Sequence, residues 1–485
     1  MSIVDEHCSV KGTVLKFNNK TYSCVLNQTD ITTNKNKFYI MQIIKVNDTY
    51  YHFTRYGRTG EVGVCATKPY TNESTAVNMF EKQFKTKTGN PFDTNNFVKK
   101  IGKYFMSQVS YEDEIEKVKD IIPKDKLAVK SVLDERVQNL LALLSNVDIM
   151  QQNLLTLNID SKKCPLGKLN SNQLDSAGQI IDKIQQIVMT PILTDENKQN
   201  LISLSSEFYT YLPMSFGRKK PPAISSQEMI NNYKDTIVEL KNMVVAVQVA
   251  ANNNIGSVHP LDSIYSNIKT KIAPLDKDSE MYAVISDYVK NTHGPTHPYK
   301  LELLDVFEVE QEGKVEKFEA HSGKIGNDTL LFHGSHVSNI ISIVKNDLLV
   351  NPQMINKGVV ITGKMFGLGL YFASCISKSF SYCRTESSNN TACMILARVP
   401  LGKIAKRVNA DYYVTPESLK REKCDSIQGV GKYTPSSSQK INDIIIPNGK
   451  LIESKQPNTL LYDEHIIYNS NQQLIKYLIL VKNVK

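Results

Sequence analysis

Three segments in the C-terminal part of the chain place reactive side chains beside strand-like apolar runs. His333 and Gly334 follow the apolar run 330–332. Tyr371 follows a Gly-x-Gly bend, and Glu464 stands at the start of another strand-like run. Taken singly, each residue type is most often structural at such a position. Their joint occurrence carries more weight, because an imidazole, a phenol and a carboxylate together can hold and polarise a substrate.

The usual signatures of cofactor and nucleophile sites are missing. The sequence has no GxxxxGK[ST] loop, no HExxH and no GxSxG with suitable partners. The glycines of MFGLGLYF do not complete GxGxxG. A Walker-type phosphate loop, a Rossmann fingerprint, a zinc-protease helix and a nucleophile elbow are therefore excluded as the source of activity.

Composition narrows the class of protein further. The eight cysteines form no CxxC pair, which argues against a zinc finger and a disulfide scaffold and favours a reducing compartment. No stretch approaches the ~18–20 apolar residues of a membrane span, so no membrane partner is expected. At 485 residues and 41% hydrophobic content, the chain should form about three folded domains.

Periodicity changes along the chain at three places. Residues 1–107 are rich in short β-branched and aromatic runs and end in a helix for which Ser74 is the candidate N-cap. Residues 108–125 are acidic and predict a linker. Residues 126–260 repeat apolar residues at helical spacing, and residues 261–485 return to short strands and loops. The expected fold class is multidomain α+β: a β-rich domain, an all-α bundle and a mixed α/β domain.

The positive charge is concentrated at the N-terminal end. Of the formal net charge of +9, residues 1–107 contribute most, with 15 Lys and Arg against 8 Asp and Glu. Such an excess fits a module that faces nucleic acid, although a solvated basic surface is the plainer interpretation of charge alone.

Together, these segments resemble the poly(ADP-ribose) polymerases over nearly the whole chain. The segments FHGS, GLYFASCISKSFSY and YDEHIIY resemble the His–Tyr–Glu catalytic centre of that family. FTRYGRTGEVG stands where the family has its Trp-Gly-Arg signature, and KKCPLGKL (162–169) and FYTYLPMSFGRKKPP (208–222) resemble its regulatory helical domain. The resemblance implies a WGR-like DNA-sensing domain at 1–107, a regulatory helical domain at 126–260 and an ADP-ribosyltransferase catalytic domain at 261–485.

The resemblance also implies how NAD+ would be bound as a substrate. His333, Tyr371 and Glu464 are the expected catalytic residues. The backbone of Gly334 and the hydroxyl of Ser335 would hold the nicotinamide amide, because an amide needs one donor and one acceptor. The remaining expected NAD+ contacts are the stacking rings of Tyr371 and Tyr382, the adenine-ribose contact of His333, and Lys378 and Ser379 in the same pocket.

The chemistry of transfer gives Glu464 its expected role. Breaking the glycosidic C–N bond of NAD+ develops oxocarbenium-like positive charge, which a nearby carboxylate stabilises. The same carboxylate can polarise an acceptor hydroxyl. By resemblance we expect transfer to protein acceptors including the chain itself, elongation to poly(ADP-ribose), activation by DNA ends or nicks, and no metal.

The chain departs from the family pattern at positions that bear on DNA sensing and inhibition. Tyr56 replaces the Trp of the signature, while Gly57 and Arg58 are kept, and these three are the expected DNA contacts. A smaller ring should stack more weakly. No Asp or Glu occurs between Glu239 and Asp262, where the family carries carboxylates facing the NAD+ site, so autoinhibition should be looser.

Two alternatives remain open on the sequence. One is a mono-ADP-ribosyltransferase of the same fold, and the other is a catalytically weak protein that binds DNA ends. The expected location is the nucleus, with the cytoplasm as the alternative.

Overall fold

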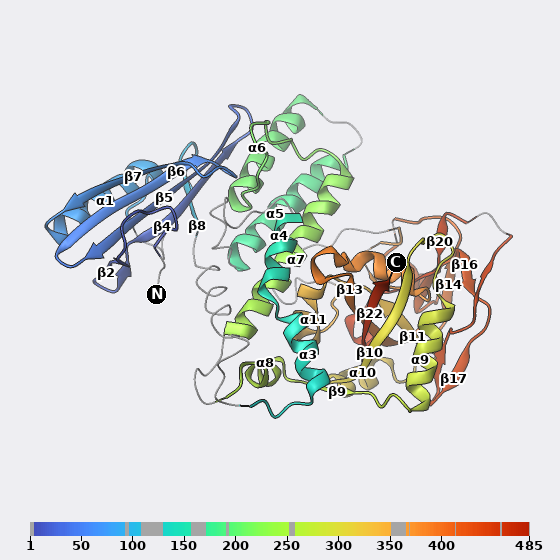
Figure 1. Ribbon diagram of the computed structural model, residues 1–485. Helices are drawn as coiled ribbons and strands as arrows, with labels where there is room; N and C mark the ends of the chain where they lie inside the picture. The colour runs from blue at the N-terminus through green and yellow to red at the C-terminus, as the bar shows by residue number, and fades with distance from the viewer. Residues whose placement is uncertain are drawn as a thin grey trace. The chain divides into compact units, whose positions relative to one another are not determined.

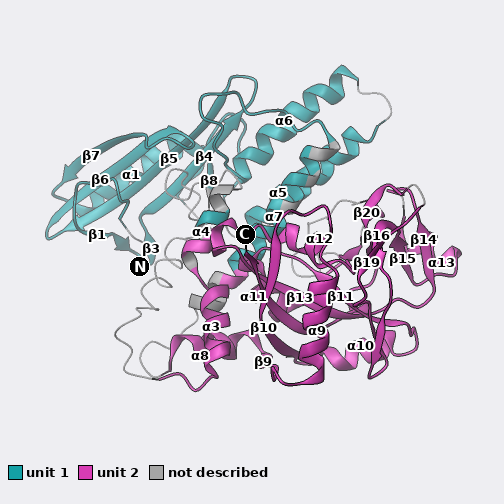
Figure 2. Ribbon diagram, turned by 45° about the vertical axis from the view of Figure 1, so that its right-hand side comes forward, with its two compact units in different colours: residues 1–120, 151–244 teal, residues 121–150, 245–485 magenta. Residues whose placement is uncertain are grey.

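The computed structural model describes residues 4–92, 97–107, 130–156, 171–190, 194–251, 258–350, 365–367, 369–412, 414–455 and 458–484. The expected linker 108–125 and the segment 162–169 lie outside these residues. The chain divides into two compact units, residues 1–120 with 151–244, and residues 121–150 with 245–485 (Figure 2).

The first unit begins with an antiparallel sheet of strand order β7-β6-β5-β4-β8, to which β1 adds by pairing with β5 (Figure 1). Its strands, with the small β2-β3 hairpin, are β1 Thr13–Val14, β2 Lys16–Phe17, β3 Lys20–Thr21, β4 Ser23–Asp30, β5 Lys35–Val46, β6 Thr49–Arg58, β7 Val64–Tyr70 and β8 Phe105–Ser107.

One helix, α1 (Glu73–Thr88), covers this sheet and closes its core. Phe80 and Phe84 of the helix are fully buried against Leu26 and Met41 of the sheet. The N-cap is Asn72, whose side chain accepts the N–H of Thr75, so the prediction of Ser74 was wrong by two residues. The expected β-rich region is confirmed, but it does not end in the helix, because the chain returns after α1 and adds β8 to the sheet beside β4.

The helical region follows the predicted apolar spacing. Its helices are α3 Glu135–Leu144, α4 Val147–Thr156, α5 Ser171–Val188, α6 Asp195–Tyr211, α7 Gln227–Ala251 and α8 Pro260–Ile268. Two buried lysines of α7 pair with two aspartates of α5: Lys234 with Asp182, and Lys241 with Asp175. The two lysines are seven residues apart along α7, and their aspartates are seven residues apart along α5 in the opposite direction. The two ion pairs therefore hold α5 and α7 in one antiparallel register.

The second unit is built on a seven-stranded sheet of order β17-β18-β11-β13-β22-β10-β9. Those strands are β9 Thr270–Pro274, β10 Lys300–Gln311, β11 Asp328–His333, β13 Thr391–Pro400, β17 Gln439–Ile441, β18 Ile444–Ile446 and β22 Leu474–Val484. The central strands β11, β13 and β22 are almost continuously apolar and buried, as strands covered on both faces must be.

Two smaller sheets and several short helices complete the second unit. The four-stranded sheet β12-β21-β15-β14 and the three-stranded sheet β19-β16-β20 comprise β12 Leu370–Phe372, β14 Ile404–Arg407, β15 Ser426–Gly429, β16 Gly431–Pro435, β19 Leu451–Glu453, β20 Leu460–Tyr462 and β21 Glu464–Ile467. The helices are α9 Glu280–Asn291, α10 Lys314–Ser322, η1 Val337–Asn339, α11 Ile340–Asn346, α12 Ile376–Phe380, η3 Ser381–Cys383, η4 Thr385–Ser388, α13 Pro416–Arg421 and η5 Ser470–Gln472.

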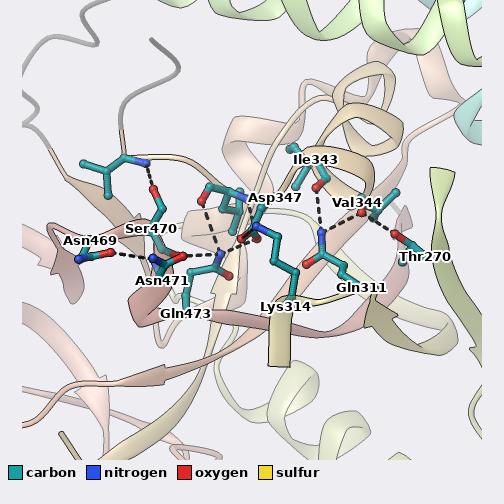
Figure 3. A network of polar contacts seen from close by, with 12 residues as sticks. Thr270, Gln311, Lys314, Ile343, Val344, Asp347, Asn469, Ser470, Asn471 and Gln473 are labelled. Carbon is teal, nitrogen blue, oxygen red and sulfur yellow. Dashed lines mark hydrogen bonds and ion pairs between the residues drawn. The ribbon is translucent and has the colours of Figure 1, made fainter. Parts of the chain in front are cut away.

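A buried polar network holds the end of α11 (Figure 3). Asp347 follows the helix with φ 84 and ψ 169, a conformation that favours glycine. Its Oδ2 accepts from Lys314 Nζ at 2.7 Å, and its Oδ1 accepts from Gln473 Nε2 at 2.6 Å. The backbone N–H of Leu348 also donates to Oδ1. Three donors therefore compensate the strained backbone and the buried charge.

Candidate active site

The ends of three strands from two sheets meet at the site. A bridge between Phe332 and Ala373 joins the end of β11 to the chain just after β12. Strand β12 pairs with β21, with Tyr371 opposite Ile466 and Phe372 opposite His465. Residues that are far apart in sequence are thereby set on adjoining strand ends.

His333 and Tyr371 are joined directly. Nδ1 of His333 lies 2.9 Å from the backbone oxygen of Tyr371 and donates to it in the tautomer with hydrogen on Nδ1. The hydroxyl of Tyr371 donates to Gly367 O at 2.8 Å and accepts from Phe366 N at 3.0 Å. Burial raises the pKa of Tyr371 well above its ordinary value, so the ring is a fixed, neutral surface.

Glu464 is a nearly buried carboxylate held by one lysine. Its side chain is 12% exposed, and its Oε1 lies 2.8 Å from Nζ of Lys378. The same ammonium donates to the backbone oxygen of Tyr462 at 3.1 Å. The second oxygen, Oε2, is buried and has no hydrogen-bond partner among the residues that the structure describes. An acceptor left open in this way suits a hydroxyl donor from a bound substrate.

Gly334 packs so closely against α12 that a side chain cannot fit there. A Cβ at residue 334 would lie 1.8 Å from the backbone oxygen of Ser379. The hydroxyl of Ser379 donates to Phe332 O at 3.3 Å, and Ser335 Oγ accepts from Asn339 Nδ2 at 3.1 Å. The hydroxyl of Ser379 is thus bonded to the backbone just before Gly334, whereas the hydroxyl of Ser335 is held by a side chain.

Tyr382 completes the set on the open side. This residue is 51% exposed, in contrast to the buried Ser379. Tyr382 lies in η3, directly after α12, and Lys378 of α12 is paired with Glu464. The structure therefore gathers all the NAD+-site residues expected from the sequence into one region of the second unit.

The expected DNA contacts lie together at the end of β6 in the first unit. Tyr56 is 41% exposed and stacks on Tyr39, with ring centroids 5.2 Å apart. Gly57 faces the backbone of Gly63, where a Cβ would approach to 2.8 Å. Arg58 donates to Asn34 O and to Lys219 O, and also to Gly217 O. Its guanidinium thus joins β6 to the segment between α6 and α7.

Sequence reasoning missed two polar residues of the site. Asn339 holds the hydroxyl of Ser335, and Asp463, which directly precedes Glu464, is only 3% exposed. No helical spacing signals the Ser335–Asn339 contact, because Ser335 lies in the loop before the short 3-10 helix η1. For Asp463, no local pattern distinguishes a buried carboxylate from a solvated one.

Within the described part of the chain, no group of three or more His, Cys, Asp or Glu side chains is arranged to hold a metal ion. None of the described helices combines the length and apolar character needed to cross a bilayer.

Comparison with known proteins decides the family. Residues 279–483 match the poly(ADP-ribose) polymerase catalytic domain, residues 131–265 the regulatory domain of the same polymerases, and residues 22–98 the WGR domain. Poly(ADP-ribose) polymerase 2 of Homo sapiens is 34% identical over 498 residues, covering 99% of this chain and 83% of the relative. The chain belongs to the poly(ADP-ribose) polymerase family. Residues 279–483 are accordingly an ADP-ribosyltransferase domain that takes NAD+ as its substrate.

Other relatives in this family are longer. A poly(ADP-ribose) polymerase of Drosophila melanogaster is 33% identical over 95% of this chain, which covers 46% of that relative. Poly(ADP-ribose) polymerase 1 of Danio rerio is 32% identical over 97% of this chain, again covering 46% of the relative. The chain therefore spans about half the length of these two relatives. The family match confirms the expected fold class of WGR, helical and α/β catalytic parts.

Proposed function

We propose that the protein transfers ADP-ribose from NAD+ to protein acceptors, including itself, and elongates it into poly(ADP-ribose) when it binds DNA ends or nicks. The observation that carries the proposal is Glu464, whose Oε1 is held by Lys378 while its Oε2 stays buried with no partner in the described chain. We further propose that the three domains expected from the sequence, 1–107, 126–260 and 261–485, divide sensing, regulation and transfer.

The catalytic residues have separate roles in this proposal. Oε2 of Glu464 accepts a hydroxyl of the nicotinamide ribose, and its charge stabilises the positive charge that develops as the C–N bond breaks. Lys378 keeps the carboxylate in place through Oε1. His333, fixed by Tyr371 O, contacts the adenine-side ribose.

The nicotinamide end would lie against the Gly334 segment. The N–H and C=O of Gly334 hold the amide, with Ser335 and Ser379 supplying hydroxyls. Tyr371 and Tyr382 supply aromatic rings on which the pyridine can stack. The absence of a Cβ at Gly334 supports this position for the amide, because the side chain of any other residue would collide with the backbone oxygen of Ser379.

DNA sensing is assigned to the surface around Tyr56, Gly57 and Arg58. An exposed ring supported by Tyr39 suits stacking on the end of a duplex. The bonds of Arg58 to Gly217 O and Lys219 O offer a physical link from that surface to the helices. DNA-dependent action also favours a nuclear location, with cytoplasm as the alternative.

One labelling experiment tests the proposal. The purified chain is incubated with radiolabelled NAD+, with and without blunt or nicked duplex DNA, and the products are separated on a denaturing gel. We expect a labelled high-molecular-weight smear from the wild type and its loss in Glu464→Gln, with NAD+ binding retained in both. A single shifted band would replace elongation by mono-transfer. Equal, background label in the wild type and the variant would contradict enzymatic transfer.

A further inference from the structure

A second carboxylate lies directly beside Glu464. The side chain of Asp463 is nearly inaccessible, and each of its oxygens has one neutral donor. Oδ1 accepts the N–H of Gly431 at 2.8 Å, and Oδ2 accepts Nε2 of Gln428 at 2.9 Å. Among the described residues, no lysine or arginine is within ion-pair distance of it. Burying a charge with only neutral donors costs free energy, so the burial of this carboxylate needs an explanation.

The charged and titratable groups around Asp463 come from four elements. The positive charges of Lys378 in α12 and Lys406 in β14 favour the ionised form of Asp463. The negative charge of Asp463 in turn helps to raise the pKa of Tyr288 in α9. Glu464 and His465 follow Asp463 directly in β21, and Nε2 of His465 lies 4.0 Å from Oδ2 of Asp463. Burial lowers the pKa of His465 to about 4, so this imidazole is neutral near pH 7.

Counting charge around Lys378 indicates what Asp463 does. Lys378 is bonded to Glu464, so these two groups sum to zero, and Lys406 is left out of the count because it is exposed and solvent screens its charge. An ionised Asp463 brings the cluster to a net charge of −1, whereas a protonated Asp463 leaves it neutral. In a buried site, where charges are weakly screened, a net negative cluster stabilises developing positive charge better than a neutral one.

We propose that Asp463 is a positioning residue whose negative charge balances Lys378, so that the charge of Glu464 remains available to the transferring ribose. The inference rests on the proposed transferase function and adds to it a residue that does not touch the substrate. Asp463 acts through Lys378 and through its hold on Gly431 and Gln428, which fixes the chain at the start of β21.

The proposal gives the transfer rate a specific pH dependence. Burial raises the pKa of Asp463 to about 6. The wild-type kcat should therefore fall as pH drops through about 6, because the cluster loses its net charge on protonation. In Asp463→Asn the amide keeps the shape and can still accept from Gly431 N, but it cannot titrate.

The test measures kcat and the KM for NAD+ between pH 5 and pH 8.5 at saturating DNA. We expect Asp463→Asn to lose the acid limb, with kcat about tenfold lower at pH 7.5 and KM unchanged. Gln428→Leu, which removes a donor that favours ionisation, should move the limb to higher pH. The control Asp443→Asn makes the same chemical change at an exposed carboxyl and should keep the wild-type limb. A limb of unchanged midpoint in both Asp463→Asn and Gln428→Leu would overturn the proposal.

Thermal unfolding separates this inference from the proposed function. A carboxyl whose pKa is higher in the folded chain stabilises the fold most when protonated, and that stability is lost as pH rises toward about 6. As pH rises from the ordinary pKa of an aspartate to about 6, the Tm of the wild type should fall relative to that of Asp463→Asn. Parallel plots of Tm against pH for the two proteins would overturn the inference even if the enzyme is active. Absence of transfer by the wild type at every pH would remove the proposed function and this role with it, whatever the Tm curves show.

Discussion

Single residues at the site are constrained by contacts that leave little room for substitution. Gly334 is the most tightly constrained glycine of the site, because the absence of a side chain lets the end of β11 lie against the backbone oxygen of Ser379. The exposed ring of Tyr56 is the opposite case, a residue whose neighbours leave one face open.

Gly334→Ala should strongly reduce turnover while leaving most of the fold intact. The new Cβ would overlap Ser379 O at 1.8 Å, so β11 and α12 must separate and the amide site must deform. We expect kcat/KM for NAD+ to fall by about a hundredfold or more, measured by label transfer. Gly313→Ala is the control for backbone strain without a clash, since a Cβ there meets nothing within 4 Å although φ is +68. Wild-type turnover by Gly334→Ala would refute the tight contact.

Tyr56→Ala should weaken DNA binding, and Tyr56→Trp should strengthen it. One aromatic ring stacked on a base or sugar contributes about 1–3 kcal/mol, and a larger ring offers more area. Anisotropy with a labelled blunt duplex at fixed salt gives both affinities. Tyr412→Ala, an exposed tyrosine of the second unit, serves as the control. If all three variants bind like the wild type, Tyr56 is a strand residue and no more.

At the scale of elements, buried polar groups fix how the elements pack. The Lys234–Asp182 and Lys241–Asp175 pairs specify one register of α5 against α7, where apolar stripes alone would tolerate several. The Asp347 network similarly specifies how the chain leaves α11 (Figure 3).

Removing one member of a buried ion pair should cost more than removing both. Lys234→Met leaves Asp182 with a half-buried, uncompensated charge, and we expect a loss of about 3–5 kcal/mol in the free energy of unfolding. Lys234→Met combined with Asp182→Leu should recover most of this loss. Urea unfolding of Lys234→Met, Asp182→Leu and the double variant measures these costs, and additive single-variant costs would contradict the coupling.

Asp347 offers a comparison in which glycine should be tolerated better than alanine. Both Asp347→Ala and Asp347→Gly lose the bonds to Lys314 and Gln473. Only glycine adopts φ 84 without strain, so Asp347→Gly should be more stable than Asp347→Ala by about 1 kcal/mol. Thermal unfolding decides this, and the reverse order would show that strain at residue 347 is negligible.

At the scale of the whole molecule, the proposal couples DNA binding to transfer through the helices. The sequence between Glu239 and Asp262 has no Asp or Glu, and the expectation of loose autoinhibition rests on this. Arg58 supplies a link within the first unit, from β6 to the segment that precedes α7.

Weak autoinhibition should appear as high activity without DNA. We expect DNA to raise the transfer rate by no more than about tenfold, because little coupling energy is needed to release a loosely inhibited site. Initial rates of label transfer with and without blunt duplex give this ratio. Arg58→Ala should bring the ratio close to one, and a ratio of a thousand in the wild type would contradict loose inhibition.

The sequence by itself determined the domain order, the fold class and the identity of the candidate site residues. Local patterns carry these features: period-two and helical apolar spacing indicate the fold class, and short motifs such as FHGS and GLYFA indicate the candidate site residues. Helix ends were less certain, because Asn72 and Ser74 are both good caps and only the hydrogen bond to Thr75 N chooses between them.

Only the tertiary structure decided which groups meet and how deeply they are buried. The Lys378–Glu464 pair joins residues far apart in sequence: Lys378 lies on α12, which follows β12, and β12 is hydrogen-bonded to β21, the strand that begins at Glu464. Asp463 and Glu464 are adjacent and chemically alike, yet one is held by neutral donors and the other by a lysine. Burial and charge environment arise from packing between distant segments, so no local pattern could assign the two carboxylates their different roles.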